Sequence, residues 1–554
     1  MTRNNNIITR DIRVGKNAAE EDTELLFECF VDSSALHEAM DVNSNASIIS
    51  GRTGSGKSAI IQYINRRERT SFLSPVDMAM THISNSDVLR FLNDIGADLN
   101  LFFQAIWKHV LLVEYIRLKY RITDEKNSTG WFNGIWQTFN TDRSKARALA
   151  YLEKYAGNLW VTIDENVKQL TESYEGRIQA ELGIDVSKFA TKAGYGANLS
   201  QQNKTEYIAR VRKIMNADQL QDLSKVISLL ADGSSSAMNN HYILIDHLDE
   251  RWVDEGIKYK LINSLVEALP KFRPIRNLKI VVALRTDVIE RSIQENEDSA
   301  FQREKFRDKL IGIEWNEKSL KELIDKRIGL TFRRKYSPQR QVLFDDLFTQ
   351  KVKGQSPFDY ILDRTLLRPR DLISFTNECL ETADQKYAIS PSDIQNAELR
   401  YSQYRYEALL DEWRVPFPSL SLIMELLRGK EHAFRLGEFT DHEIDNTALE
   451  IIARKKPYLN SLSRSATALC DNPSPHARSL FKRTLASVLY RVGAIGLKLS
   501  PDEPVIYAHR NRPIVSAAEI DEETGVRVVK MLYAYLRINE KGKKPKPALQ
   551  PERG

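Results

Sequence analysis

Short apolar runs alternate along this chain with longer segments in which apolar residues recur at helical spacing. Runs with the length of buried strands occupy residues 46–50, 242–245, 280–284 and 310–315, and a weaker run occupies 75–83. Helical spacing follows the first run at 57–66 and the last at 320–328. Strands that alternate with helices in this way pair in parallel and are flanked by helices. The pattern therefore predicts an α/β fold with a parallel sheet.

A long segment interrupts this α/β pattern. Residues from about 87 to 239 carry helical periodicity, so a helical insertion is predicted between the second and third strands. Its first part is rich in aromatic side chains, namely Trp107, Tyr115, Tyr120, Trp131, Phe132, Trp136 and Phe139. These side chains either form the core of a helical bundle or present a surface to a partner.

The rest of the chain divides into further predicted domains. Residues 1–45 form a linker with a short amphipathic helix at 21–31, and the α/β core runs from 46 to 328. Helical patterning predicts a helical subdomain at 329–405 and a mixed C-terminal domain at 406–539. The last residues, 540–554, are rich in Lys, Pro and Gly and are predicted to form a disordered basic tail.

The C-terminal domain combines a basic helix with a predicted hairpin. The amphipathic helix at 478–492 carries Arg478, Lys482, Arg483 and Arg491. Apolar residues alternate at 494–499 and 505–509 around an acidic turn, as in a β-hairpin. A helix followed by such a hairpin indicates a winged-helix-like domain. This domain either binds DNA, with Arg510 and Arg512 near phosphates, or packs against another domain.

Composition places the chain among ordinary globular proteins. Of 554 residues, 42% are hydrophobic and 28% are charged, and 80 Lys and Arg nearly balance 75 Asp and Glu. The net charge of +5 gives no argument for nucleic-acid binding by itself. The three cysteines lie far apart and show neither a disulfide framework nor a zinc motif. Because no apolar run reaches the ~20 residues of a membrane span, we expect a cytoplasmic protein without membrane contact.

One motif carries a specific chemistry. Residues 51–58 match G-x-x-x-x-G-K-[ST] at every fixed position, directly after a strand and before a helix. The motif consists of Gly51, Arg52, Thr53, Gly54, Ser55, Gly56, Lys57 and Ser58. Glycines let backbone N–H groups approach phosphates, the lysine reaches the β- and γ-phosphates, and the serine hydroxyl binds Mg²⁺. The motif therefore predicts a P-loop that binds ATP with Mg²⁺.

A strand that ends in a carboxylate supplies the second part of such a site. The apolar run before Asp246 ends at this residue, which we predict to hold Mg²⁺ together with Ser58. Hydrolysis also needs a carboxylate that orients or deprotonates water. Since His247 follows Asp246, the candidate catalytic carboxylates are Glu250 and Asp249, which alternatively cap the next helix.

With these motifs in place, the chain resembles a bacterial family of P-loop ATPases. Besides the P-loop, the resemblance rests on AAEED (18–22), IDHLDERW (245–252), LRTD (284–287) and RPRDL (368–372), and it extends over about 13–539. That family is related to the AAA+, STAND, KAP and origin-recognition ATPases and is often encoded in mobile or defence loci. The resemblance implies an AAA+/STAND-like fold in which residues 329–405 form the helical lid.

The resemblance also implies roles for several side chains. Arg285 or Thr286 takes the place of the polar sensor of the γ-phosphate, with an ordinary strand end as the alternative. Arg370 takes the place of the lid arginine, with a plain helix N-terminus as the alternative. Arg303 and Arg307 stand where oligomeric relatives carry an arginine finger, although the charge-rich sequence around them is more typical of a solvated face.

The chain departs from the AAA+ pattern in the distance between its two motifs. Roughly 190 residues separate Ser58 from Asp246, so an insertion of roughly 130 residues is implied. We expect an ATP-binding and ATP-hydrolysing switch or motor that acts as a homo-oligomer or with a partner effector protein, in a setting such as antiphage defence. Two alternatives are an ATP-controlled, DNA-binding initiator or loader, and a nucleotide-binding scaffold with little hydrolysis, for which His247 argues.

Overall fold

The chain divides into two compact units. The computed structural model describes residues 6–75, 99–120, 218–232, 239–250, 252–253, 255–294, 306–336, 341–454 and 460–539, together with 89, 92, 148, 151, 172, 175–176, 179–180, 202–203, 205–209 and 304. Residues 32–314 form one unit, which we call the sheet unit. Residues 1–31 and 315–554 form the other, which we call the helical unit.

A parallel sheet organises the sheet unit. Its described strands are β1 (Ile48–Gly51), β2 (Arg69–Leu73), β3 (His241–Ile245), β4 (Leu278–Arg285) and β5 (Leu310–Gly312), in the order β2-β3-β4-β1-β5. All neighbouring pairs are parallel. The carboxyl ends of the strands therefore meet at one edge of the sheet. The predicted α/β class with a parallel sheet is confirmed.

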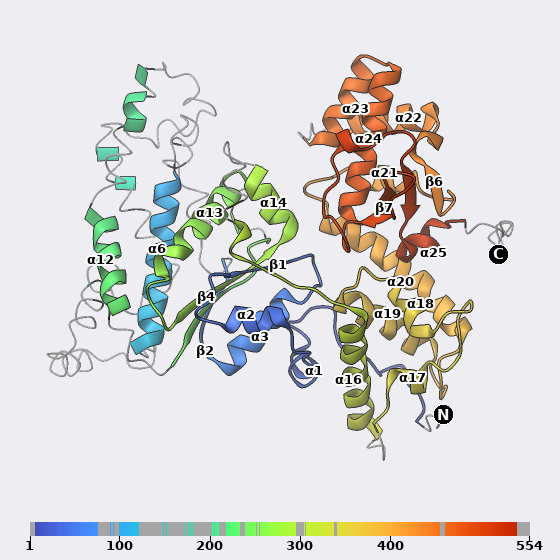
Figure 1. Cartoon of the computed structure of the whole chain (residues 1–554), viewed down its shortest axis with the longest axis horizontal. Helices are drawn as coiled ribbons and strands as arrows, with labels where there is room; N and C mark the ends of the chain where they lie inside the picture. The colour runs from blue at the N-terminus through green and yellow to red at the C-terminus, as the bar shows by residue number, and fades with distance from the viewer. Residues whose placement is uncertain are drawn as a thin grey trace, which may run out of the picture. The chain divides into compact units, whose positions relative to one another are not determined.

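Helices lie on both faces of this sheet (Figure 1). On one side lie α6 (Asn100–Tyr120), α13 (Glu255–Ala268) and α14 (Thr286–Gln294), and on the other lie α2 (Ser34–Met40) and α3 (Lys57–Arg67). The helix α12 (Asp218–Asp232) contacts α6. This division follows from right-handed crossovers, because the chain passes from β1 to β2 in one direction and returns through β3 and β4 in the other.

The described part of the predicted insertion has a buried core. In α6, Trp107 and Tyr115 are fully buried, and Trp107 Nε1 donates a hydrogen bond to the Leu261 carbonyl at 2.9 Å. These two aromatic side chains are therefore core residues of the sheet unit and do not form a surface for a partner. The other aromatic positions from 131 to 139 lie outside the described residues.

Two element predictions need correction. The second strand is β2 at Arg69–Leu73, which precedes the predicted run; of that run, 75 is a turn and 76–83 lie outside the described residues. β2 is an edge strand with partly exposed polar residues, so it lacks the apolar pattern of a buried strand. The predicted helix at 21–31 is shorter, since α1 spans Thr23–Glu28.

The helical unit begins with a series of helices. After α1 come α16 (Glu317–Tyr336), α17 (Phe344–Leu347), α18 (Pro357–Leu362), α19 (Pro369–Thr382), α20 (Pro391–Glu412) and α21 (Leu420–Glu425). Pro391 occupies the first turn of α20, and Ser390 with Asp393 forms its capping box. The predicted boundary at 328 falls inside α16, which runs through it without a break.

The C-terminal part of the helical unit combines helices with a small sheet. Its helices are α22 (Asp441–Ala453), α23 (Ser461–Asp471), α24 (Pro475–Val492) and α25 (Tyr533–Leu536). Its described strands β6 (Ala433–Arg435), β7 (Ile495–Lys498), β8 (Ile506–Tyr507) and β9 (Gly525–Val528) are antiparallel, in the order β6-β9-β7-β8. The predicted basic helix and the β7–β8 hairpin are confirmed.

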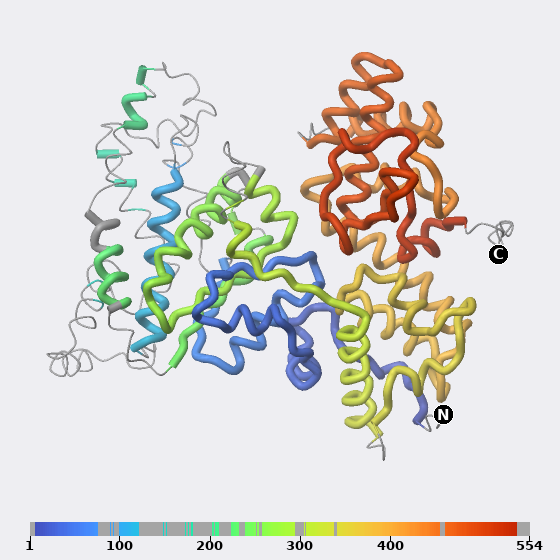
Figure 2. The backbone as a smooth tube through the Cα atoms, in the orientation of Figure 1, coloured from blue at the N-terminus to red at the C-terminus, as the bar shows by residue number. Residues whose placement is uncertain are grey.

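The N-terminal segment is part of the helical unit (Figure 2). Asn377 in α19 accepts a hydrogen bond from Val14 N and donates one to Gly15 O, both at 2.9 Å. Arg327 in α16 donates to Val14 O and pairs with the buried Asp22 at 2.7 Å. Gly15 has φ +139°, and a Cβ there would lie 2.0 Å from Arg327 Nη1. The backbone therefore approaches the arginine as only glycine allows.

Candidate phosphate-binding and metal site

The loop of residues 51–58, which we call the glycine loop, joins β1 to α3 at the carboxyl edge of the sheet. Gly54 and Gly56 have φ values of +78° and +104°, which favour glycine. A Cβ on Gly51 would lie 2.4 Å from Ser55 Oγ, so a larger residue there would displace the Ser55 side chain. Gly56 is the N-cap of α3 and has no side chain to cap the helix. The first amides of α3 therefore form an anion-binding helix end of the usual kind.

Lys57 places its ammonium group over this loop. Its Nζ donates hydrogen bonds to the carbonyls of Gly51 and Arg52, both at 3.1 Å. These acceptors are neutral carbonyls, so the loop itself does not compensate the charge of the ammonium. The glycine loop thus combines a cation with the positive end of a helix.

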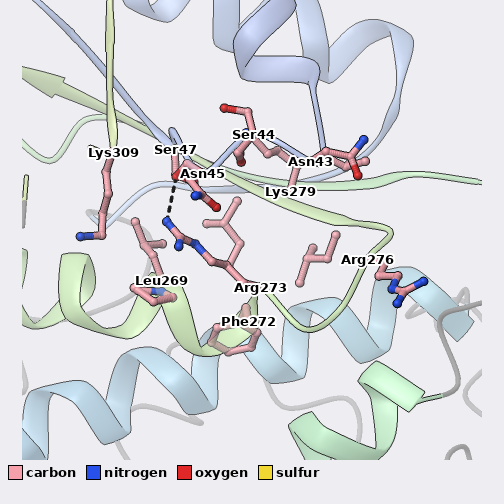
Figure 3. Close-up of a pocket in the computed structure, with 14 residues that line it drawn as sticks. Asn43, Ser44, Asn45, Ser47, Leu269, Phe272, Arg273, Arg276, Lys279 and Lys309 are labelled. Atoms are coloured by element: carbon pink, nitrogen blue, oxygen red, sulfur yellow. Dashed lines mark hydrogen bonds between the residues drawn. The ribbon is translucent and has the colours of Figure 1, made fainter. Parts of the chain in front are cut away.

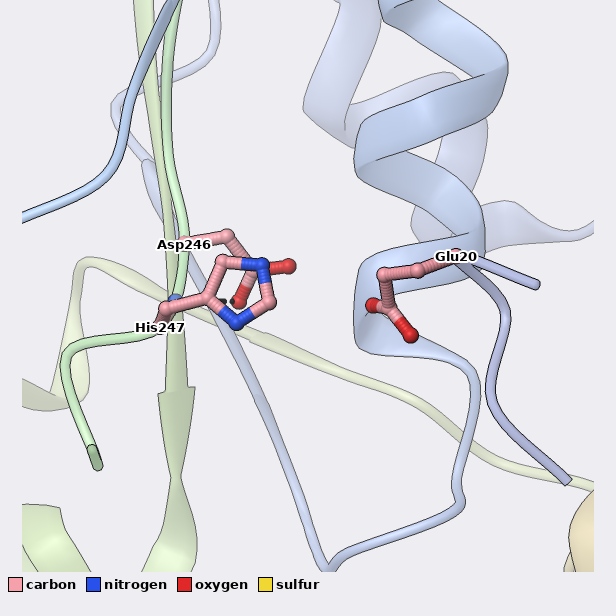
Figure 4. Close-up of side chains that lie close together, drawn as sticks. All are labelled: Glu20, Asp246 and His247. Atoms are coloured by element: carbon pink, nitrogen blue, oxygen red, sulfur yellow. Dashed lines mark hydrogen bonds between the residues drawn. The ribbon is translucent and has the colours of Figure 1, made fainter. Parts of the chain in front are cut away.

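Asp246 follows β3 and is the acidic counterpart of the loop. Only 5% of its surface is exposed. Burial raises the pKa of Asp246, while a hydrogen bond with Ser58, a hydrogen bond from the His247 amide and the charges of His247 and Lys57 lower it. The amide of His247 lies 2.8 Å from Asp246 Oδ1 (Figure 4). The structure thus brings together the two predicted Mg²⁺ ligands, Ser58 and Asp246.

The sheet order explains how these residues meet. Strand β4 lies between β1 and β3, so Ser58 reaches Asp246 across the end of β4. After β1 the chain crosses over β4 and β3 to reach β2. After β4 the chain crosses in the opposite direction, over β1, to reach β5. Such a topological switch point opens a crevice outside the carboxyl ends of parallel strands, where ligands bind.

The loop after β3 holds the two candidate catalytic carboxylates. His247 has φ +64°, a strained conformation for a side chain of this size. Its Nδ1 lies 2.8 Å from Glu250 Oε1. The buried Lys258 of α13 donates to the carbonyls of Asp249 and Glu250 at 2.7 and 2.8 Å. Sequence reasoning missed Lys258, because a single lysine inside a helix matches no motif.

Arg285 lies at the same edge, at the end of β4. Its guanidinium forms two hydrogen bonds with Asp287, each 2.9 Å long. Its Nη1 also lies 3.5 Å from Asp249 Oδ2. Thr286, the alternative sensor, is the first residue of α14. The structure therefore brings Arg285 to the loop after β3.

The predicted lid arginine lies in the helical unit. Arg370 Nε donates to the carbonyl of Asn17 at 2.8 Å. Its neighbour Arg368 is buried, 3.0 Å from Asp371 and 3.6 Å from Glu412. Asp371 also forms an ion pair with the buried Arg405 at 3.4 Å. Within the RPRDL stretch, Arg368 and Asp371 thus belong to an internal ion-pair network that sequence reasoning missed.

Of the two arginine-finger candidates, the structure describes Arg307. Arg307 is exposed and lies before β5, and Arg303 is outside the described residues. Neither the finger nor the solvated-face interpretation is tested by this placement.

Most of the basic residues assigned to a DNA surface have partners inside the helical unit. Arg478 forms hydrogen bonds with Asp445, the shortest at 2.8 Å. Lys482 is buried between Asp441 and Glu522, at 3.8 Å from each. Arg491 lies over the rings of Trp413 and Phe417, and Arg512 pairs with Glu519. The basic side chains Arg478, Lys482 and Arg491 of α24 are therefore already engaged within the helical unit.

Comparisons with known proteins found a matching family and similar proteins. A family described as the FunZ-associated C-terminal helical domain matches residues 318–410, which span α16 to α20 except for their outermost residues. A putative transposon gamma-delta 80.3 kDa protein of Escherichia coli (strain K12) is 22% identical over 534 residues, which cover 94% of this chain and 66% of that protein. The allergen Alt a 2 of Alternaria alternata is 31% identical over 124 residues, which cover 22% of this chain and 65% of the allergen. The chain thus spans just under two thirds of each relative.

In the part of the chain that the structure describes, no helix has the length and apolar content needed to cross a bilayer.

Proposed function

We propose that this chain binds ATP with Mg²⁺ at the glycine loop and hydrolyses it, and that it works as a nucleotide-controlled switch or motor. The observation that carries the proposal is the hydrogen bond between Ser58 and Asp246 beside Lys57. A hydroxyl, a carboxylate and an ammonium from two non-adjacent strands meet at the switch point of a parallel sheet. Together with the left-handed glycines, they form the set of groups that a P-loop needs.

The electrostatics of the site fit an incoming Mg·ATP. The carboxylate of Asp246 is largely desolvated, so a divalent cation beside it would stabilise its charged form. Ser58 and Asp246 would bind this cation, which supplies charge stabilisation at the β- and γ-phosphates. Lys57 would exchange the carbonyls of Gly51 and Arg52 for phosphate oxygens, a stronger, charge-assisted contact.

Hydrolysis adds roles for the loop after β3. Glu250 would orient the attacking water, with His247 holding its carboxylate through Nδ1. Asp249 is the second candidate base, and Arg285 reaches it from the end of β4. If neither carboxylate acts on water, the chain would be a nucleotide-binding scaffold; the engagement of Glu250 by His247 is the observation that favours this second candidate.

In this proposal the helical unit would supply the moving part. The family match at 318–410 is described as helical and covers the region assigned to a lid. The similarity of the chain to a transposon-named protein supports a role in a mobile element. The defence setting rests only on the resemblance to AAA+ and STAND ATPases. DNA binding through α24 is a weaker proposal, since Arg478 and Lys482 are already occupied.

The test is Mg·ATP binding and turnover by wild type and Lys57→Ala, with particle mass recorded for each and with and without DNA. We expect wild type to bind Mg·ATP in calorimetry and Lys57→Ala to lose turnover by about 100-fold or more. Lys225→Ala removes an exposed lysine of the same unit and serves as the control. Well-folded wild type that gives no binding heat with millimolar Mg·ATP or Mg·GTP would overturn the proposal.

A further inference from the structure

A cavity lies at the opposite edge of the same sheet, where the strands begin. It has a volume of about 190 Å³ and is contained within the sheet unit. Ser47 precedes β1, Lys279 is the second residue of β4, and Lys309 directly precedes β5. Since the strands are parallel, this edge is remote from the glycine loop. We call this space the amino-edge cavity.

Basic side chains line this cavity. Its cationic residues are Arg273, Arg276, Lys279 and Lys309, and none of the described lining residues is acidic. The two arginines are exposed, whereas the two lysines are buried, so that charge lies both at the surface and in the wall. Figure 3 shows Arg273 at the centre, with Lys309 on one side and Arg276 on the other. The concentration of one sign of charge favours an anion here.

The buried Lys279 forms hydrogen bonds with backbone carbonyls, but no acidic side chain is among the described residues that line the cavity. Lys279 is 2% exposed and donates to the carbonyls of Ser44 and Ala46 at 3.0 and 2.7 Å. An ammonium has three N–H donors, so two carbonyls leave one. Burial brings the pKa of Lys279 down to about 8, against the charges of Asp41 and Glu38, which raise it, and with a smaller lowering contribution from Arg273. The charges of Asp41 and Glu38 therefore offset only part of the cost of burying this ammonium.

Arg273 has the geometry to complete an anion site. Its Nη2 makes one long hydrogen bond, 3.4 Å, to the carbonyl of Asn45. A guanidinium carries five donors in a planar fork that suits phosphate oxygens. The cavity is smaller than the roughly 300 Å³ that pockets for whole organic ligands reach. Its size and charge suit one or two phosphoryl groups.

We propose that the amino-edge cavity binds a phosphate group, separately from the glycine loop. The phosphate belongs either to a free ion such as pyrophosphate or to the backbone of a nucleic acid that passes over the cavity. Both sources share the same chemistry, since each presents anionic oxygens to Arg273, Arg276 and Lys279. This site does not depend on ATP binding at Lys57, because the two lie at opposite edges of the sheet.

The experiment measures pyrophosphate binding by calorimetry at low salt, in a Lys57→Ala background that weakens the glycine loop. We expect Lys57→Ala to bind pyrophosphate, and the further changes Arg273→Gln and Arg276→Gln to weaken binding at least about 10-fold. The matched control adds Arg66→Gln and Lys225→Gln instead, which remove the same charge elsewhere in the sheet unit. Circular dichroism and Mg·ATP binding in the Arg273→Gln, Arg276→Gln protein with native Lys57 check its fold.

Absence of pyrophosphate binding in the Lys57→Ala protein, or equal weakening by the cavity and control changes, would overturn the proposal. A second arm follows a labelled single-stranded DNA by fluorescence anisotropy. Loss of DNA binding in the cavity variant, with competition by pyrophosphate, assigns the site to a nucleic-acid backbone. Unchanged DNA binding, with pyrophosphate binding lost, assigns it to a free phosphate. Pyrophosphate and DNA binding can both be measured even if the protein does not turn over ATP. The proposed phosphate site and the proposed ATPase function can therefore be refuted independently.

Discussion

The sheet unit and the helical unit both bury ionisable side chains, but different causes dominate the pKa shifts of these side chains. In the sheet unit burial dominates: it raises the pKa of Asp246, lowers the pKa of His109 to about 4 and lowers the pKa of Lys279 to about 8. In the helical unit ion-pair partners dominate at the cluster of Asp371 with Arg368 and Arg405. Burial would raise the pKa of Asp371, but the charges of Arg368 and Arg405 bring it to about 2.

The cause of the pKa shift thus distinguishes buried groups whose charge is not fully offset from buried groups that form ion pairs within the protein. A buried group whose charge its own protein does not compensate is a candidate for binding or catalysis. Asp246 and Lys279 meet this description, and they lie at the two edges of the sheet where we propose ligands. A buried ion pair such as Arg368 with Asp371 instead holds one arrangement of the helices, and removing one member leaves the other uncompensated.

The strongest test of this comparison removes one carboxylate from each unit. Asp371→Asn should lower the free energy of unfolding by about 3–5 kcal/mol, because Arg368 and Arg405 lose their buried counter-charge. Asp246→Asn should leave that free energy unchanged or raise it, since it removes a desolvated charge. Urea unfolding followed by circular dichroism measures both. Equal destabilisation by the two changes would break the comparison.

The pH dependence of the sheet unit provides a second, smaller test. Burial, with the charge of Arg117, keeps His109 neutral until its pKa of about 4, whereas the unfolded side chain takes up its proton near 6.5. The folded state therefore loses stability as pH falls from 6.5 to 4, by about 3 kcal/mol at 1.36 kcal/mol per pKa unit. Above pH 6.5 this contribution is fully present.

His109→Gln should remove this pH dependence while keeping a polar side chain beside Tyr151. The measurement is the urea midpoint at pH 7, 5.5 and 4.5 for wild type and variant. Asp371 behaves differently, since its contribution persists through this range and is lost only as pH falls from 3.8 to about 2. Parallel curves for wild type and His109→Gln would show that His109 is not the group responsible.

The smallest effect concerns the exposed carboxylates after β3. Glu250→Gln should slow ATP turnover about 100-fold, equivalent to about 2.7 kcal/mol, and should leave bound ATP trapped. Phosphate release and nucleotide retention measure the two parts of this expectation. Asp249→Asn is the companion variant, because Arg285 holds that carboxylate instead. Near-normal turnover by both variants would refute the assignment of either carboxylate as base.

The predictable parts of the fold are those with a local signal. Strands β1, β3 and β4 are buried, so their apolar runs are visible in the sequence. The edge strand β2 was missed because Arg69, Thr70 and Ser71 need no apolar pattern where one side of the strand is unpaired. The N-terminal segment was assigned to a linker, since its partner Asn377 lies more than 360 residues away.

The candidate site shows the same division. The glycine loop and Asp246 could be predicted, because each follows an apolar strand with residue types that the chemistry requires. Lys258 and Lys279 could not, since their roles depend on backbone carbonyls that only the folded chain brings near. Arg368 looked like part of a lid motif, and only its burial beside Asp371 shows an internal partner.

The hydrogen bonds between the N-terminal segment and Asn377 of α19 have a consequence for how the protein folds during synthesis on the ribosome. Val14 is synthesised 363 residues before Asn377, the side chain that holds it. At 5–20 residues per second, about 20–70 s pass between the two. During this interval Ile8, Ile12 and Val14 lack their native cover, and the whole sheet unit can fold in between. Nascent chains should therefore need chaperone protection at this segment until α19 has emerged.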